Sequence, residues 1–143
     1  MKITDVMTKD IKTVSPTDSV QQAASFMLNA DTGSIPVCDG DQIVGMITDR
    51  DIAVRGTAQG LGPDAKVSEV MSGDIVCASC EDSVDDIARQ MADRQVRRMP
   101  VVDENQKLVG MVSLGDLSRE TQGEAAHQAL EGVSAKGGEH QQG

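Results

Sequence analysis

The sequence has few aromatic residues and few histidines, and its positive charges are outnumbered. Its 143 residues include one Phe and no Trp or Tyr, which excludes a nucleic-acid site built on aromatic stacking. The 13 Lys and Arg against 23 Asp and Glu give a formal charge of −10, which disfavours nucleic acid and anionic lipid as partners. Both histidines, His127 and His140, lie beyond the last apolar pattern. We therefore expect no catalytic residue, no metal ligand and no enzyme activity.

Long apolar runs are also absent. The runs Ile43–Ile47 and Leu108–Val112 are far shorter than a bilayer span. The opening residues mix Lys, Asp and Thr, unlike a secretory signal. We therefore expect a cytoplasmic protein without a membrane partner. The number of cysteines is odd, and these residues, Cys38, Cys77 and Cys80, are predicted to be free thiols without a disulfide framework.

The chain contains an internal repeat. Residues Ile3 to Ile52 realign on Val67 to Leu117, with Gln106 as an inserted residue. Each copy has the pattern β-α-β-β-α, so we predict an α+β fold of two repeats. Because units this small are marginal alone, the repeats should pack on each other with pseudo-twofold symmetry. The predicted boundaries are repeat 1 at 1–58, a connector at 59–66, repeat 2 at 67–120 and a disordered tail at 121–143.

The first helix of each copy is predicted from apolar residues at helical spacing. Ser15-x-x-Asp18 and Ser79-x-x-Asp82 have the form of a capping box, so we expect the helices to begin there, with Pro16 at the first helical position. The predicted apolar faces consist of Val20, Ala23, Ala24, Met27 and Leu28, and of Val84, Ile87, Ala88, Met91 and Ala92.

A hydroxyl and a carboxylate recur where each hairpin leads into its second helix. Asp51 follows Thr48 by three residues, and Asp116 follows Ser113 in the same way. One interpretation is structural, since Thr and Ser cap helices and an acid three residues on completes a capping box. The other is functional, since a carboxylate can accept both hydrogens of a ribose diol and free helix-start N–H groups favour an anion. The motif alone leaves both open.

Three linked motifs resemble the CBS (cystathionine β-synthase) domain. They are Gly45-Met46-Ile47-Thr48-Asp49-Arg50-Asp51-Ile52, Thr13-Val14-Ser15-Pro16 and Ile35-Pro36-Val37, and the second copy matches in the same order and spacing. Over about residues 3 to 120 the chain looks like a tandem CBS pair, or Bateman module, similar to stand-alone bacterial pairs of the hypoxic-response type. The resemblance implies clefts between the repeats that hold an adenosine nucleotide (AMP, ADP or ATP). It also implies a homodimer formed through the CBS helices.

The resemblance also implies site residues, carried over by position. Asp51 and Asp116 would bind ribose hydroxyls, and Arg97 and Arg98 would bind phosphates, although any one arginine can equally be a solvated surface residue. The predicted ligand-binding residues are Thr13, Val14, Ile35, Pro36, Thr48, Arg50, Asp51, Cys77, Ala78, Arg97, Arg98, Met99, Pro100, Ser113 and Asp116.

The two copies differ where phosphates would bind. Thr32-Gly33-Ser34 stands in the first copy where Val96-Arg97-Arg98 stands in the second, and Gly115 replaces Arg50. This asymmetry argues against equal occupancy of the two clefts.

Three hypotheses follow for the function. The leading one is a non-catalytic regulatory protein that binds an adenosine nucleotide and signals to a target protein. The second is a redox- or metal-responsive stress protein that uses the Cys-x-x-Cys pair Cys77 and Cys80, which can also be ordinary occupants of a strand-to-helix junction. The third is a ligand-free dimerisation scaffold in which Thr48 and Asp51 serve only as caps.

Overall fold

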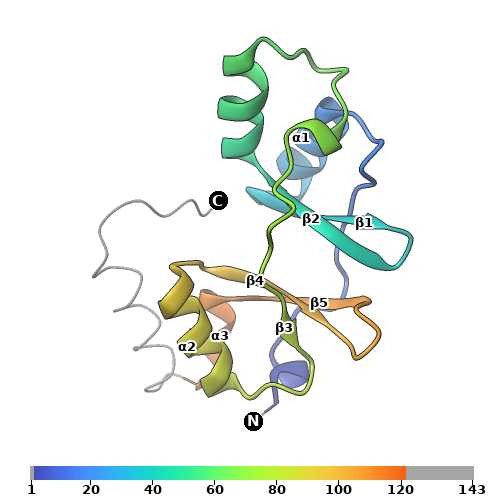
Figure 1. Ribbon diagram of the computed structural model, residues 1–143. Coiled ribbons are helices and arrows are strands. Elements are labelled where there is room, and N and C mark those ends of the chain that lie inside the picture. The colour runs from blue at the N-terminus through green and yellow to red at the C-terminus, as the bar shows by residue number, and fades with distance from the viewer. Residues whose placement is uncertain (1, 122–143) are drawn as a thin grey trace. The chain divides into compact units, whose positions relative to one another are not determined.

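The computed structural model describes residues 2–121, which form two compact α+β units (Figure 1). One unit joins residues 2–11 to residues 76–121, and the other consists of residues 12–75. Residues 2–11 belong to the first sequence repeat but join the unit that contains most of the second. Residues 67–75 belong to the second repeat but join the unit that contains most of the first. The predicted tail lies outside the described residues except for Thr121, which ends a helix.

The unit of residues 12–75 has one α-helix packed on a two-stranded antiparallel sheet. Val14 adds a parallel bridge to Val37, and its backbone N–H donates to the Pro36 carbonyl oxygen at 3.1 Å. The elements are α1 (Val20–Ala30), β1 (Ser34–Asp39), β2 (Gln42–Thr48), the π-helix η2 (Asp51–Gly56), and the 3₁₀ helices η3 (Thr57–Gln59) and η4 (Val67–Glu69).

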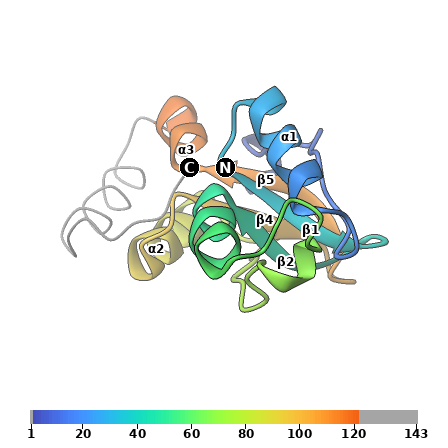
Figure 2. The same ribbon diagram turned by 90° about the horizontal axis from the view of Figure 1, so that it is seen from above.

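The other unit has a three-stranded sheet in the order β3-β4-β5. The middle strand, β4, runs parallel to β3 and antiparallel to β5, and β4 and β5 lie side by side in Figures 1 and 2. Its elements are η1 (Ile3–Asp5), β3 (Ala78–Ser79), α2 (Val84–Arg94), β4 (Arg98–Val102), β5 (Leu108–Ser113) and α3 (Leu114–Thr121).

The first helix begins later than the capping-box pattern predicts. Ser15 and Asp18 form a turn, in which the Ser15 N–H donates to the Asp18 carboxylate at 2.8 Å. Helix α1 then begins at Val20, and the Ser19 hydroxyl caps it. The prediction that Ser15 starts the helix, with Pro16 inside it, was wrong because the sequence offers two consecutive serine patterns. The serine adjoining the apolar run makes the cap.

In the second copy the helix also begins later than predicted. The Ser79 N–H donates to Asp82 at 3.0 Å within a turn, and helix α2 begins at Val84 with Ser83 as its N-cap. Ser83 and Asp86 form a reciprocal capping box, in which the Ser83 hydroxyl accepts from the Asp86 N–H at 3.1 Å. The hydrogen bonds with Ser83 lower the pKa of the Asp86 carboxyl.

Each unit has its own apolar core. In α1 the core face is Val20, Ala23 and Met27, as predicted, whereas Ala24 is exposed and Leu28 is 82% exposed. Only one edge of the apolar stripe meets the sheet, so the predicted face was too wide. In α2 the buried residues are Val84, Ile87, Ala88 and Met91.

The exchanged opening segments are residues 2–11 and residues 67–75, and each pairs with the last strand of the unit that it joins. Thr8 exchanges two backbone hydrogen bonds with Met111, at 2.8 and 2.9 Å. Ser72 does the same with Met46, at 2.9 Å in both directions. Glycine is required at the crossing point because a Cβ on Gly45 would lie 2.7 Å from the Ser72 carbonyl oxygen.

The second helix differs between the copies. In residues 114–121 it is an α-helix, whereas η2 is a π-helix, and the N–H of Thr57 reaches the carbonyl oxygens of both Ala53 and Ile52. π-Helical turns are rare and are frequently found at functional sites. The π-helix begins on Asp51, one of the predicted site residues.

Candidate functional site

The first candidate site is built at the junction of β2 and the helix that follows. The Thr48 N–H donates to Asp51 Oδ2 at 3.0 Å, and the Asp51 N–H donates to Thr48 Oγ1, also at 3.0 Å. The Asp51 side chain is 16% exposed, and its Oδ1 lies 3.9 Å from Nη1 of Arg55. The reciprocal bonds hold the carboxylate in one orientation, with Oδ1 directed away from the cap.

The second candidate site repeats this geometry in the other unit. The Ser113 N–H donates to Asp116 Oδ2 at 3.0 Å, and the Asp116 N–H donates to Ser113 Oγ at 3.1 Å. Asp116 is buried, with 7% of the whole residue exposed, whereas Asp51 is partly buried. The structural interpretation of both motifs is therefore confirmed, since all four residues form reciprocal caps, and the binding of a ligand by them stays a prediction.

Strand register brings the other predicted residues of residues 12–75 close to Thr48. Ser34 pairs with Thr48 and Ile35 pairs with Ile47, while Val14 bonds to the next part of β1. The side chains of Val14 and Ile35 belong to the core, and Pro36 is buried. The Val14 N–H donates to the Pro36 carbonyl oxygen and the Val14 carbonyl oxygen accepts from the Cys38 N–H, so the Val14 backbone is paired within the unit. Thr13 and Thr48 retain partly exposed side chains.

The other unit gathers its predicted residues in the same way. Arg98 pairs with Ser113, and the Leu114 N–H donates to the Arg97 carbonyl oxygen at 2.7 Å. Both arginines therefore lie beside the capping hydroxyl, with Arg97 exposed and Arg98 partly exposed. Ala78, Met99 and Pro100 are buried, so their side chains are core residues.

Arg50 lies on the surface at the start of the first site's helix. It is exposed, and its backbone N–H donates to Asp49 Oδ1 at 2.8 Å. The N–H of Asp49 in turn donates to the Gly33 carbonyl oxygen at 2.9 Å, which ties this helix start to the beginning of β1.

The cysteines are unbridged thiols, as predicted: Cys38 is buried, and Cys77 and Cys80 are partly buried. Burial raises the pKa of the Cys77 thiol. Cys80 packs against the core and precedes α2 by a full turn, so it does not stand at the helix start. Within residues 2–121, no three His, Cys, Asp or Glu side chains gather to hold a metal ion.

Two buried polar groups were missed by the sequence interpretation. Ser34 Oγ and Gln95 Nε2 are buried and have no hydrogen-bond partner within the described part of the chain. Native proteins leave few such groups unsatisfied. Both belong to the loop that leads from the first helix into the hairpin, beside the two candidate sites, and no sequence pattern signals their burial.

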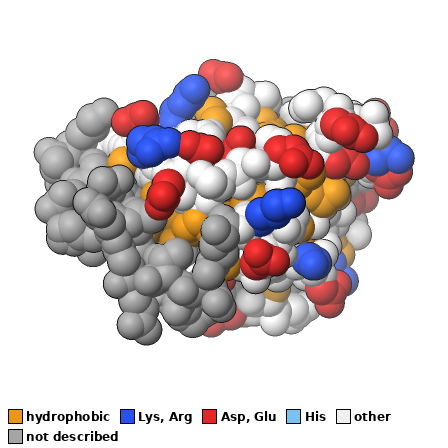
Figure 3. Space-filling model, turned by 90° about the horizontal axis from the view of Figure 1, so that it is seen from below, with side chains coloured by type: hydrophobic (Ala, Val, Ile, Leu, Met, Phe, Trp, Pro, Cys, Tyr) orange, Lys and Arg blue, Asp and Glu red, His pale blue; other side chains and the backbone are white. Residues whose placement is uncertain are grey.

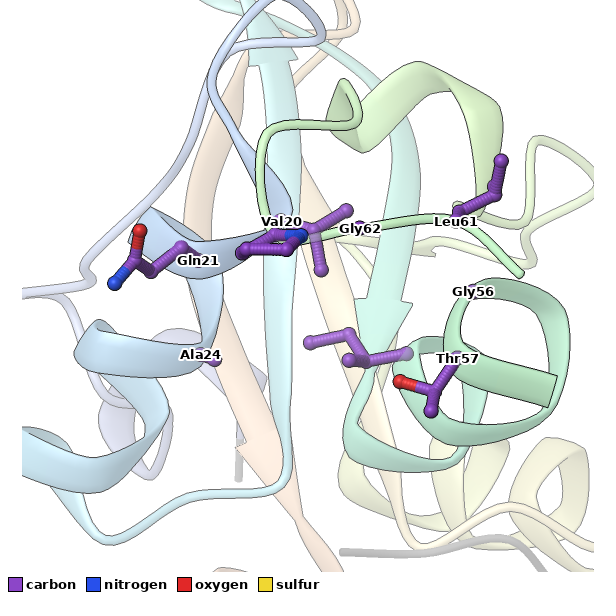
Figure 4. Close-up of a pocket in the computed structure, with 9 residues that line it drawn as sticks. Val20, Gln21, Ala24, Gly56, Thr57, Leu61 and Gly62 are labelled. Carbon is purple, nitrogen blue, oxygen red and sulfur yellow. The ribbon is translucent and has the colours of Figure 1, made fainter. Parts of the chain in front are cut away.

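An apolar pocket of about 370 Å³ also lies within residues 12–75 and was not predicted. Its walls come from α1, the helix after Asp51 and the connector, and Figure 4 shows Val20, Ala24 and Leu61 around it. Gln21 and Thr57 supply the polar side chains of its lining.

The surface carries both signs of charge. Figure 3 shows carboxylates interspersed with Lys and Arg on the face in view. None of the helices within residues 2–121 combines the length and the apolar character needed to span a bilayer.

Comparison with known proteins gives consistent results. A family model described as the CBS domain matches the chain twice, over residues 3–55 and 67–123. The CBS domain-containing protein YhcV of Bacillus subtilis (strain 168) is 45% identical over 133 residues, which are 92% of this chain and 94% of the relative.

Two solved structures share the fold. The crystal structure of Hypoxic Response Protein I with two coordinated zinc ions has a TM-score of 0.77 at 34% identity, and the match covers 84% of this chain and 98% of that one. The CBS domain pair of protein MJ0100, in complex with 5′-methylthioadenosine and S-adenosyl-L-methionine, has a TM-score of 0.73 at 28% identity. That match covers 83% of this chain and 94% of the other.

Proposed function

The chain belongs to the CBS-domain family and carries the domain twice, and from this premise we propose that it is a non-catalytic regulatory protein that binds an adenosine nucleotide. The ligand class we propose is AMP, ADP or ATP, held at the predicted site residues. Binding acts by population shift, since a ligand that favours one arrangement of the protein increases its share. The resemblance to Hypoxic Response Protein I supports a role in the stress response.

The observation that carries this proposal is the oriented carboxylate at each strand-to-helix junction. In both copies a hydroxyl and a carboxylate bond reciprocally to each other's backbone N–H groups at 3.0–3.1 Å. A carboxylate fixed in this way can accept hydrogen bonds from the two hydroxyls of a ribose without first losing side-chain freedom. The adenosyl ligands held by the CBS pair of MJ0100 support the choice of ligand class.

Isothermal titration of the folded full-length protein with AMP, ADP and ATP tests the proposal. We expect saturable binding of at least one nucleotide. Absence of binding heat for all three nucleotides, with the fold verified by circular dichroism, would refute nucleotide binding. The ligand-free scaffold would then remain, because the reciprocal caps are also sufficient for that role.

We further propose a homodimer formed through the CBS helices. Support comes from α1, whose Leu28 is 82% exposed, and from Val54 of η2, which is 43% exposed. Both residues belong to elements that also line the apolar pocket of this unit, and contact with a second copy would remove their apolar area from water. The partner that receives the signal, like the cytoplasmic location, stays a prediction.

The metal-responsive alternative has one supporting observation, the two zinc ions in the Hypoxic Response Protein I structure. The described residues of this chain do not fit such a site, because Cys77 and Cys80 gain no third ligand among residues 2–121. The redox form of this hypothesis is weakened by the raised pKa of Cys77, since the thiolate is the reactive species.

A further inference from the structure

The apolar pocket within residues 12–75 shares no lining residue with the predicted ligand-binding set. Its volume is about 370 Å³, and its walls come from α1, η2 and the connector. Small molecules usually bind in pockets of about 300–1,000 Å³ whose walls are mostly apolar. The size and the lining of this pocket therefore fit a binding site of another kind than the two strand-to-helix junctions.

Backbone hydrogen bonds hold the walls of the pocket together. The Gln21 N–H donates to the Pro63 carbonyl oxygen at 3.1 Å, which ties the connector to the first turn of α1. The Leu61 N–H donates to the Gly56 carbonyl oxygen at 3.0 Å, which ties the connector to η2. All four residues line the pocket. Because the walls are already fixed to one another, a ligand would not have to order them.

The pocket extends from the surface to the core of its unit. Val20 belongs to this core and is 6% exposed, and Ile52 and Leu61 pack against the core. Ala24, which also lines the pocket, is exposed, so the pocket opens to solvent. An apolar ligand would remove the area of these walls from water, which is favourable.

One wall of the pocket is the helix that differs between the copies. In η2 the Thr57 N–H reaches the carbonyl oxygen of Ile52, a π-type hydrogen bond, and both residues line the pocket. The corresponding helix of the second copy, α3, is an α-helix. Since π turns are uncommon and are frequently found at functional sites, this turn is a second indication of a binding site here.

The side chains of the lining determine which ligand fits. No residue that lines the pocket within the described part of the chain carries a charge. A charged group buried there would lack a partner, which is costly, so the ligand should be uncharged. In Figure 4 the Gln21 amide points away from the other labelled residues, whereas the Thr57 hydroxyl is directed toward α1. Thr57 therefore offers a hydroxyl that can donate or accept one hydrogen bond.

We infer that this pocket binds an uncharged small molecule that has an apolar body and a single hydrogen-bonding group. The apolar body packs against Val20, Ile52 and Leu61, and the polar group bonds to the Thr57 hydroxyl. This site goes beyond the proposed function and does not depend on nucleotide binding. Indole serves as a probe, because it combines a fused apolar ring with one N–H donor.

Titration of indole with the full-length protein, followed by fluorescence, tests the inference. The chain has no Trp and no Tyr, so the indole emission comes from the probe. We expect saturable binding with a dissociation constant of about 1 mM or tighter, and a shift of the emission to shorter wavelength. Tryptamine and indole-3-acetate carry opposite charges on the same ring, and both should bind about tenfold more weakly or less.

Variants on the walls test the location. Ala24→Leu should weaken indole binding about tenfold or more, because the larger side chain occupies the pocket, and leucine is a good helix former. Ser25→Leu is the matched control, since Ser25 is exposed on the same helix outside the lining, and it should bind indole like the wild type. Thr57→Val removes only the hydroxyl and should weaken binding about two- to tenfold.

Absence of saturable indole binding by the folded wild type would overturn the inference. Equal affinities of Ala24→Leu and Ser25→Leu, an unaffected Thr57→Val variant, or tighter binding of a charged derivative would also contradict it. Indole binding by Leu28→Glu but not by the wild type would show that a second copy covers the pocket, which again contradicts the inference. None of these measurements involves a nucleotide, so their failure is distinct from a failure of the proposed function.

Discussion

Thr48 and Asp51 hold each other in place, since each accepts a 3.0 Å hydrogen bond from the backbone N–H of the other. The same two side chains therefore start a helix and, in our proposal, present Oδ1 of Asp51 to a ribose. A substitution at either residue should lower both the stability of the fold and the affinity for the ligand. The two effects can be separated by comparison with a residue that caps a helix and is not proposed to bind the ligand.

Asp51→Ala should lower the free energy of unfolding by about 1 kcal/mol, the usual contribution of a cap, and should also weaken adenosyl binding. Asp86→Ala is the matched control, because Asp86 completes the capping box of α2 with Ser83 and is not among the predicted site residues. Urea unfolding should show similar losses for both variants, while calorimetry should show weaker binding for Asp51→Ala alone. Equal ligand affinity in the two variants would show that Asp51 serves only as a cap.

Gly45→Ala should destabilise the protein by about 1–3 kcal/mol, the range for overpacking a filled position. A Cβ at this position meets the Ser72 carbonyl oxygen, which is backbone and cannot move without breaking the pairing with Met46. Gly62→Ala is the control, because a Cβ there has no atom within 4 Å. The midpoints of urea unfolding of the two variants measure the difference in stability. A Gly45→Ala variant as stable as the wild type would show that the Ser72 segment can move away from β2 without loss of stability.

Leu28→Glu should shift the protein from dimer to monomer in size-exclusion chromatography with light scattering. Leu28 is the most exposed of the large apolar residues on α1, and its burial in an interface would contribute about 1.5–3 kcal/mol per side chain. Asn29→Glu, also exposed on α1, adds the same charge without removing apolar area and should remain dimeric. A wild-type protein that is monomeric at all concentrations would contradict the proposed dimer.

Cys77 should react slowly with iodoacetamide at pH 7 and much faster above pH 9, because burial raises its pKa above the ordinary value of 9.0. A raised pKa in the folded state also makes stability depend on pH in a definite direction. The contribution of the protonated thiol is complete below pH 9 and is lost as the pH rises through the folded pKa, because the unfolded chain releases its proton first.

Cys77→Ser should remove that alkaline loss of stability, which urea unfolding at pH 8 and pH 10 can measure. Mass spectrometry of the alkylated protein reports the rate at Cys77 separately from that at Cys80. Rapid modification of Cys77 at pH 7 would instead support the redox hypothesis.

Local patterns in the sequence predicted the repeated hairpins and the reciprocal caps well. Thr48 and Asp51 are three residues apart, so their geometry is set by one turn of chain. The position of helix α1 was predicted less well, because Ser15 and Ser19 both fit a capping pattern and only the packing of Val20 decides between them.

Features that depend on distant parts of the chain could not be predicted. The sequence shows that Met7-Thr8 and Met71-Ser72 are equivalent, but equivalence cannot say which of two similar strands each segment joins. The unsatisfied hydroxyl of Ser34 likewise depends on what surrounds it after folding. The apolar pocket arises from three separate stretches of chain, whose meeting no periodicity reveals.

The exchange of opening segments constrains how such a chain can be divided. A gene fragment that ended within the connector would encode α1 and its hairpin without residues 67–75, the stretch whose Ser72 borders Met46. The complementary fragment would begin without residues 2–11, and so without Thr8 beside Met111. Either half expressed alone would lack the segment that pairs with its last strand, so we expect a protein cut within the connector to lose that pairing in both units.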